Sequence, residues 1–244
     1  MGGLLLGWTG TASVYFVNAA LFVPALIAVA VLAAPRGPAE HRPSLRPTAI
    51  VEGLRFFLSA RVIMALVLLD VGATVFGNYQ VLLPIFAKDI LAVGETGFGA
   101  LNAAPALGAL LGASTLLLLK VRRAGILVIA SVFAFALALA GFGWSTWFAL
   151  SLLFAAALGY LDALGVVIRQ TMVQTLTPDH LRGRTTAVST MFSAGAPSLG
   201  GVISGFAAGL LGAGPAVLLG SILVGVATAG ITAVFGSLRR LRTT

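Results

Sequence analysis

Long apolar runs alternate with short polar joints along almost the whole chain. A membrane-spanning helix needs roughly 20 mostly apolar residues, and each of these runs is close to that length. The first run is about Ala12–Ala34. The later runs are about Val62–Phe86, Phe98–Leu119, Gly125–Gly143, Trp147–Met172, Thr186–Leu210 and Pro215–Leu238. The pattern predicts an all-α polytopic membrane protein with about seven transmembrane helices, of which the first stands apart from the other six.

A basic, proline-rich stretch, Pro35–Pro47, separates the first run from the second. After it, apolar residues recur at helical spacing from Ile50 to Leu58, with Glu52 and Arg55 on the opposite face, which predicts a short helix at Thr48–Ala60 lying on the membrane surface. We therefore divide the chain into a first helix at residues 1–34, a loop with an interfacial helix at 35–61, and a six-helix bundle at 62–244.

The cations are sorted to one side of this predicted topology. Of the 15 Lys and Arg residues, all except Lys88 fall in joints on the same side or in the turns beside them. An excess of Lys and Arg marks cytoplasmic loops, so the 35–61 loop and the C-terminal tail are predicted to be cytoplasmic. A wrong number of spans would disrupt this sorting, so it also supports the count of helices.

Composition narrows the function. The chain is 59% hydrophobic, its mean hydropathy is +1.07, and 9% of its residues are charged, against roughly 25% in a soluble domain. The net charge of +8 lies in loops between apolar runs, which indicates contact with anionic lipid headgroups and not with nucleic acid. The chain has no Cys, no His-Glu-x-x-His, no Gly-x-Ser-x-Gly and no Walker A pattern. We expect a protein that is not an enzyme, with no metal site and no cofactor.

Polarity differs between the predicted helices. Ionisable groups in a bilayer core cost at least ~2.5 kcal/mol each and normally face a bundle interior or a wet cavity. The Gly125–Gly143 run has Ser131 as its one polar side chain and is expected to face lipid. A run of small residues at Gly200, Gly201, Gly205 and Gly209 predicts close helix contact. Polar residues concentrate in two other runs, with Asp70, Asn78, Tyr79 and Gln80 in Val62–Phe86, and Asp162, Arg169 and Gln170 in Trp147–Met172.

The stretch from Leu161 to Gln174 (LDALGVVIRQTMVQ), with Thr177 to Arg184 (TPDHLRGR) after it, resembles the tenth helix and following loop of bacterial major facilitator superfamily exporters. The similarity is to the enterobactin-exporter and macrolide-efflux branch. The segment Val51 to Leu58 (VEGLRFFL) resembles that branch's entry into helix seven. One departure is in helix eleven. Relatives often have a short run of polar residues with a carboxylate there, whereas this chain has Ala196, Pro197 and Ser198.

The resemblance implies a fold of twelve helices in two six-helix halves. This chain would correspond to helix six, the central cytoplasmic loop and helices seven to twelve, so that six of its helices form one half of a major facilitator fold. Helices seven and ten would line the central cavity, with six, nine and twelve outside. The implied function is secondary active export of amphipathic small molecules such as drugs or siderophores, coupled to protons, in the inner membrane. Helices one to five would be missing.

Three ionisable residues are the candidates for coupling. Asp162 lies about twelve residues, or roughly 18 Å, from the cytoplasmic end of its helix, close to the bilayer midplane where transporters bind substrates and ions. It is a candidate proton carrier or cation contact, or else a buried structural partner. Asp70 and Arg169 lie at similar depths on different helices, so an ion pair between them is expected, with a gating or a structural role.

The amide side chains are candidates for the substrate cavity: Asn78, Gln80, Asn102 and Gln170, with Gln174 weaker. Asn78 and Gln80 are two residues apart and cannot share one helix face, so only one of them is expected to line the cavity.

Two function classes remain open at this stage. One is an exporter whose partners are the lipid bilayer, a small-molecule substrate, protons and the missing N-terminal half. The other is a truncated, non-transporting membrane module or assembly partner. The DNA upstream of Met1 would separate them, because five further helices in frame would indicate an ordinary exporter.

Overall fold

The structure is a computed structural model that describes residues 16, 19–20, 22–24, 26–28, 54–118, 123–236 and 238. Within these residues, six helical segments are long and apolar enough to cross a membrane. In chain order the elements are α3 (Arg61–Phe76), η2 (Gln80–Leu82), α4 (Leu83–Ile85), η3 (Phe86–Ile90), α5 (Gly94–Leu118), α6 (Ala124–Trp144), α7 (Phe148–Leu176), α8 (Asp179–Leu211) and α9 (Ala213–Val234). The elements from α3 to η3 together make one span, Arg61–Ile90.

These segments confirm the six apolar runs predicted after the linker, with ends that differ by a few residues. The first predicted run, Ala12–Ala34, lies mostly outside the described residues. The linker Pro35–Pro47, the residues up to 53, the joint at 119–122 and the C-terminal tail after 238 also lie outside them.

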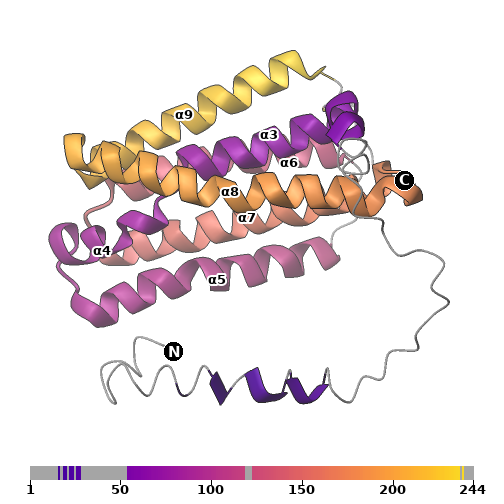
Figure 1. The fold of residues 1–244 in the computed structure, drawn as a ribbon. Helices are drawn as coiled ribbons and strands as arrows, with labels where there is room; N and C mark the ends of the chain where they lie inside the picture. The colour runs from indigo at the N-terminus through magenta and orange to yellow at the C-terminus, as the bar shows by residue number, and fades with distance from the viewer. Residues whose placement is uncertain are drawn as a thin grey trace.

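The six helical segments lie side by side and alternate in direction, so that their ends gather at two opposite ends of the bundle (Figure 1). The main helix pairs are α5 with α7, α6 with both α7 and α9, and α3 with α8. One apolar cluster surrounds Phe86 and Phe142 near the α4 end, and a second surrounds Leu66, Leu69 and Met172 nearer the opposite end. The bundle therefore has its own core, separate from any surface that faces lipid.

Glycines let α5 and α7 approach very closely. A side chain at Gly108 or Gly112 of α5 would collide with the backbone carbonyl of Ala156 or Tyr160 in α7, and a side chain at Gly159 of α7 would collide with Pro105 of α5. Small residues at helix interfaces allow this close backbone packing in membranes, where hydrophobicity alone does not hold helices together. These three glycines were not among the close helix contacts predicted from the sequence.

The close helix contact predicted along the α8 glycines from Gly200 to Gly209 is present only at the start of that run. An added Cβ at Gly200 would lie 2.8 Å and 2.9 Å from the Thr74 and Val75 carbonyl oxygens of α3, whereas Gly205 and Gly209 have no described atom within 4 Å of that position. The helices cross near Gly200 and then diverge, so the rest of this stripe contacts nothing in the described part of the chain.

The expectation that the Gly125–Gly143 run faces lipid is right for one side of α6 and wrong for the other. Ile126, Phe133 and Leu137 are exposed, whereas Val128 and Phe142 are buried. Ser131 is also buried and donates its hydroxyl to the Val128 carbonyl, 2.8 Å away, so it needs no partner outside its own helix. A helix at the edge of a bundle packs one side even when its sequence is almost uniformly apolar.

Part of the predicted interfacial helix lies within the described residues. Residues 54–59 are helical, with Leu54 and Leu58 exposed and Phe57 buried. The Phe57 ring stacks on Phe192 of α8, with ring centroids 5.7 Å apart and planes 16° apart. This contact fastens the end of the loop to the bundle.

Candidate functional site

The span that begins at Arg61 is broken near its middle. α3 ends at Phe76, and helical structure resumes at Gln80 as a 3-10 turn before Pro84, which stands in the first turn of α4. Proline has no N–H to donate, and its ring would clash with the carbonyl of the fourth residue before it, so a continuous α-helix through residues 80–84 is disfavoured. Across the break, the Tyr79 N–H donates to the Gly77 carbonyl at 2.8 Å.

This break corrects one prediction. Asn78 and Gln80 both line the same cavity, although helical spacing allowed only one of them to do so. Helical spacing does not apply to these two residues because residues 77–79 are not helical. Tyr79, between them, lines the cavity as well and packs its ring against Phe142, with centroids 5.3 Å apart.

The cavity has a volume of about 870 Å³ and is lined by α3, α5, α7, α8 and the break after α3, with Phe135 from α6. Its walls include most of the residues predicted on the spans Val62–Phe86 and Trp147–Met172, and they also extend to α5 and α8. Asn102 of α5 lines it as predicted, whereas Gln170 and Gln174 are exposed and are not among its lining residues. The polar residues that line it are Asp70, Thr74, Asn78, Tyr79, Gln80, Asn102, Asp162, Arg169, Ser193 and Ser198.

Asp70 and Arg169 form an ion pair between α3 and α7, the contact expected from their similar depths. Their side chains are 12% and 9% exposed, so the pair is largely shielded. Ser193 of α8 donates its hydroxyl to the second carboxylate oxygen of Asp70 at 2.9 Å. The three side chains tie α3, α7 and α8 together beside the cavity.

Sequence reasoning missed Ser193. The usable signal was its spacing on α8, where Ser189, Ser193 and Pro197 recur every four residues and so lie on one helix face. A lone serine in an apolar run is common, however, and without a known register between α8 and α3 nothing indicated that it would meet Asp70.

Asp162 is in a different environment from Asp70. It is exposed to the cavity, and its carboxylate makes no ion pair or hydrogen bond with the described part of the chain. Arg169 lines the same cavity seven residues further along α7, but it is engaged by Asp70 and not by Asp162, as expected from the separation of the two positions. The cavity therefore contains one neutralised ion pair and one carboxylate with no counter-charge from a described residue.

Asn78 has a structural contact as well as a place in the cavity wall. Its amide nitrogen donates to the Pro197 carbonyl of α8 at 2.8 Å. The contact lies next to the crossing at Gly200, where α3 and α8 are closest. This hydrogen bond thus holds the break in the Arg61–Ile90 span against α8 at Pro197.

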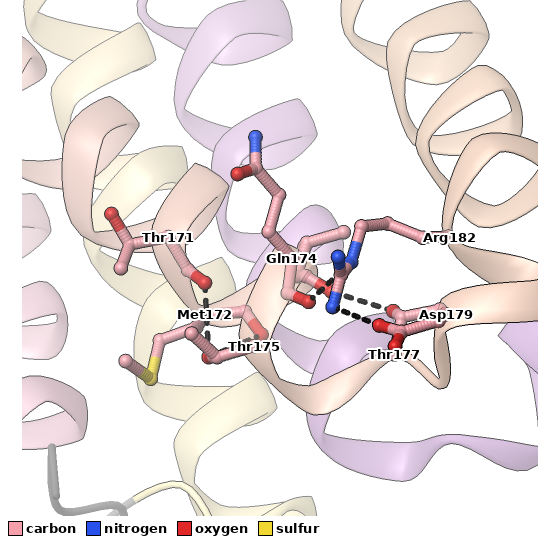
Figure 2. Close-up of polar contacts among 8 residues, drawn as sticks. Thr171, Met172, Gln174, Thr175, Thr177, Asp179 and Arg182 are labelled. Carbon is pink, nitrogen blue, oxygen red and sulfur yellow. Dashed lines mark hydrogen bonds and ion pairs between the residues drawn. The ribbon is translucent and has the colours of Figure 1, made fainter. Parts of the chain in front are cut away.

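The turn between α7 and α8 contains the motif that carried the family resemblance (Figure 2). Arg182 pairs with Asp179 at 2.6 Å and donates through Nε to the Gln174 carbonyl at 3.1 Å. Thr177 donates its hydroxyl to the Val173 carbonyl at 2.5 Å. The last carbonyls of a helix lack intrahelical partners, and these two side chains supply them, so this part of the motif builds the turn.

No group of three or more His, Asp or Glu residues lies close enough to hold a metal ion within the described ranges.

A bundle of six helices, each long and apolar enough to cross a membrane, around a cavity lined by ionisable groups is the architecture of a polytopic membrane protein. The sequence profile described as "Transmembrane secretion effector" matches residues 1–242. The chain belongs to this family and lies in the enterobactin-exporter-like branch of the major facilitator superfamily exporters.

Named relatives agree with the family. The chain is 31% identical to an "Enterobactin exporter EntS" of Shigella boydii serotype 18 (strain CDC 3083-94 / BS512) over 208 residues, which are 84% of this chain and 49% of that protein. It is 30% identical over the same shares to the protein of that name from Escherichia coli O81 (strain ED1a). The chain spans about half the length of the curated relatives it matches. No solved structure matches it significantly.

Proposed function

We propose that the chain is the helix-six-to-twelve part of a secondary active exporter of amphipathic small molecules in the inner membrane, driven by proton antiport. The observation that carries the proposal is Asp162, a carboxylate without a described counter-charge in the wall of a polar cavity. An unpaired ionisable group inside a membrane is costly, and such groups commonly mark ion and substrate pathways.

In this mechanism Asp162 holds either a proton or the donor groups of a substrate, but not both at once. Protonation removes the negative charge, and with it the attraction for a cationic or hydrogen-bonding group of the substrate. Proton entry from outside then releases substrate, and proton loss to the cytoplasm restores the binding carboxylate. Asp70 and Arg169 neutralise each other, so we assign them the role of holding α3, α7 and α8 in register.

The cavity needs a second wall. Asp162, Asn102 and Gln80 are exposed in the described residues, and lipid chains cannot satisfy such groups. We propose that a bundle of helices one to five of an exporter, completed by helix six of this chain, covers them, with Gly205 and Gly209 of α8 on the uncovered side. We call this chain together with that bundle the complete transporter. An assembly partner that supplies helices without transport is the alternative.

The relatives named as enterobactin exporters make a siderophore the first candidate substrate. The free carboxylate favours a substrate that presents a cationic or hydrogen-bond-donating group to α7, so an amphipathic cation is the second.

The test uses inside-out membrane vesicles containing the complete transporter. An inwardly acidic pH gradient should drive uptake of enterobactin or of a fluorescent amphipathic cation, and a protonophore should abolish the uptake. Uptake that persists with the protonophore present would contradict proton coupling. Absence of uptake of any probe, with the protein folded and inserted, would favour the assembly-partner alternative.

A further inference from the structure

A second groove lies at the end of the bundle that carries most of the cations, and it shares no lining residue with the polar cavity. Its volume is about 410 Å³. It is formed where the start of α3, the end of α7 and the end of α9 meet, and its walls include Arg61, Val62, Leu176, Val234, Phe235 and Gly236.

The groove is apolar except at one position. Arg61 is the cation among its lining residues. This residue is exposed, and its side chain makes no ion pair or hydrogen bond with another described residue. Two other arginines in the bundle are engaged, Arg169 by Asp70 and Arg182 by Asp179.

The groove lies at headgroup depth. Arg61 is the first residue of the 30-residue span Arg61–Ile90, and Val234 is the last of α9. Three more arginines, Arg239, Arg240 and Arg242, follow soon after Gly236 in the sequence, which assigns this end to the cytoplasmic side. The cytoplasmic leaflet is the one that presents anionic lipid, and basic pockets between helices on this side bind lipid headgroups.

We propose that this groove binds one anionic phospholipid. The lipid phosphate contacts the Arg61 guanidinium, and an acyl chain lies along Val62, Leu176 and Phe235. A soluble phosphate would match the charge but would leave the apolar walls in contact with water, so the combination of one cation with an apolar slot fits a lipid. The site joins the ends of α3, α7 and α9, so bound lipid fastens together the cytoplasmic ends of three helices.

The test is photo-crosslinking in liposomes containing the full chain. The probes are phosphatidylglycerol and phosphatidylcholine with the same photoactivatable acyl chain. Wild-type protein should crosslink phosphatidylglycerol preferentially, with adducts at Leu176, Val234 or Phe235. Arg61→Gln should lower this preference about five-fold, the effect expected for one basic residue near an anionic surface.

Two further variants separate the site from general lipid contact. Gly236→Phe should reduce adducts of both lipids, because an added Cβ at Gly236 meets no described atom within 4 Å and a ring there can enter the groove. Arg123→Gln removes an exposed cation that does not line the groove and should leave the preference unchanged. Equal loss with Arg61→Gln and Arg123→Gln, or adducts spread evenly along the helices, would overturn the proposal. Displacement of phosphatidylglycerol by millimolar inorganic phosphate would overturn the assignment of the ligand as a lipid.

Discussion

The ion pair between Asp70 and Arg169 gives the sharpest stability prediction. In Asp70→Asn the Arg169 side chain, 9% exposed, keeps its charge and loses its counter-charge. Removing one partner of a buried pair typically costs about 3–5 kcal/mol. At roughly 2–4 °C per kcal/mol for a chain of this size, the melting temperature should fall by roughly 6–20 °C. Asp70→Asn with Arg169→Gln removes both charges and should recover much of this loss.

The same chain supplies the control. Asp179 and Arg182 also form an ion pair, but their side chains are 90% and 49% exposed. An exposed pair is worth less than about 1 kcal/mol, so Asp179→Asn should shift the melting temperature by only a few degrees. The assay is fluorescence-detected size-exclusion chromatography of detergent extracts of the complete transporter after heating, with expression measured alongside. Equal shifts for Asp70→Asn and Asp179→Asn, or a double variant less stable than Asp70→Asn, would refute the reasoning.

Three further predictions concern packing, topology and assembly. Gly108→Ala should sharply reduce folded yield because its Cβ would meet the Ala156 carbonyl, whereas Gly205→Ala, with open space around it, should not; similar yields would contradict the α5–α7 contact. Cysteines placed at Glu95 and Thr146 should react with impermeant thiol reagents in intact cells, whereas a cysteine at Ser44 should not. The reverse labelling pattern would exclude the predicted topology. Thr146 is used because its neighbour Ser145 is buried and hydrogen-bonded to Ser151. Purified alone, the chain should self-associate or aggregate, because its polar cavity wall is uncovered. A monodisperse monomer that binds no co-expressed bundle of helices one to five would count against that wall.

Much of the fold could be predicted from the sequence because spanning helices satisfy their own backbone hydrogen bonds and must be apolar over a fixed length. Hydropathy therefore located the six spans from Arg61 to Val234 within a few residues. The contact between Asp70 and Arg169 also followed from physical constraint, since each charge needs a partner at its own depth.

The features that were missed depend on how helices face one another. The contact of Ser193 with Asp70 requires the register between α8 and α3, which no single-helix pattern contains. The close approach at Gly108 and Gly159 and the divergence after Gly200 are set by the crossing of helix pairs, and the contact predicted from glycine spacing on α8 holds only at its start. Gly77 and Pro84 signal the break at residues 77–79, but they do not give its length, and this length lets both Asn78 and Gln80 line the cavity.

The central claim is that Asp162 carries the coupled proton, and the most direct measurement compares two transport modes of Asp162→Asn in the complete transporter. Asn keeps the size and hydrogen-bonding capacity of the side chain but cannot gain or lose a proton. In proteoliposomes at equal pH, the variant should exchange internal for external substrate only at a higher substrate concentration, because it lacks the attraction of the carboxylate. Under an imposed pH gradient it should fail to accumulate substrate even at that higher concentration. Accumulation at the wild-type rate would contradict the account and place the coupling site elsewhere.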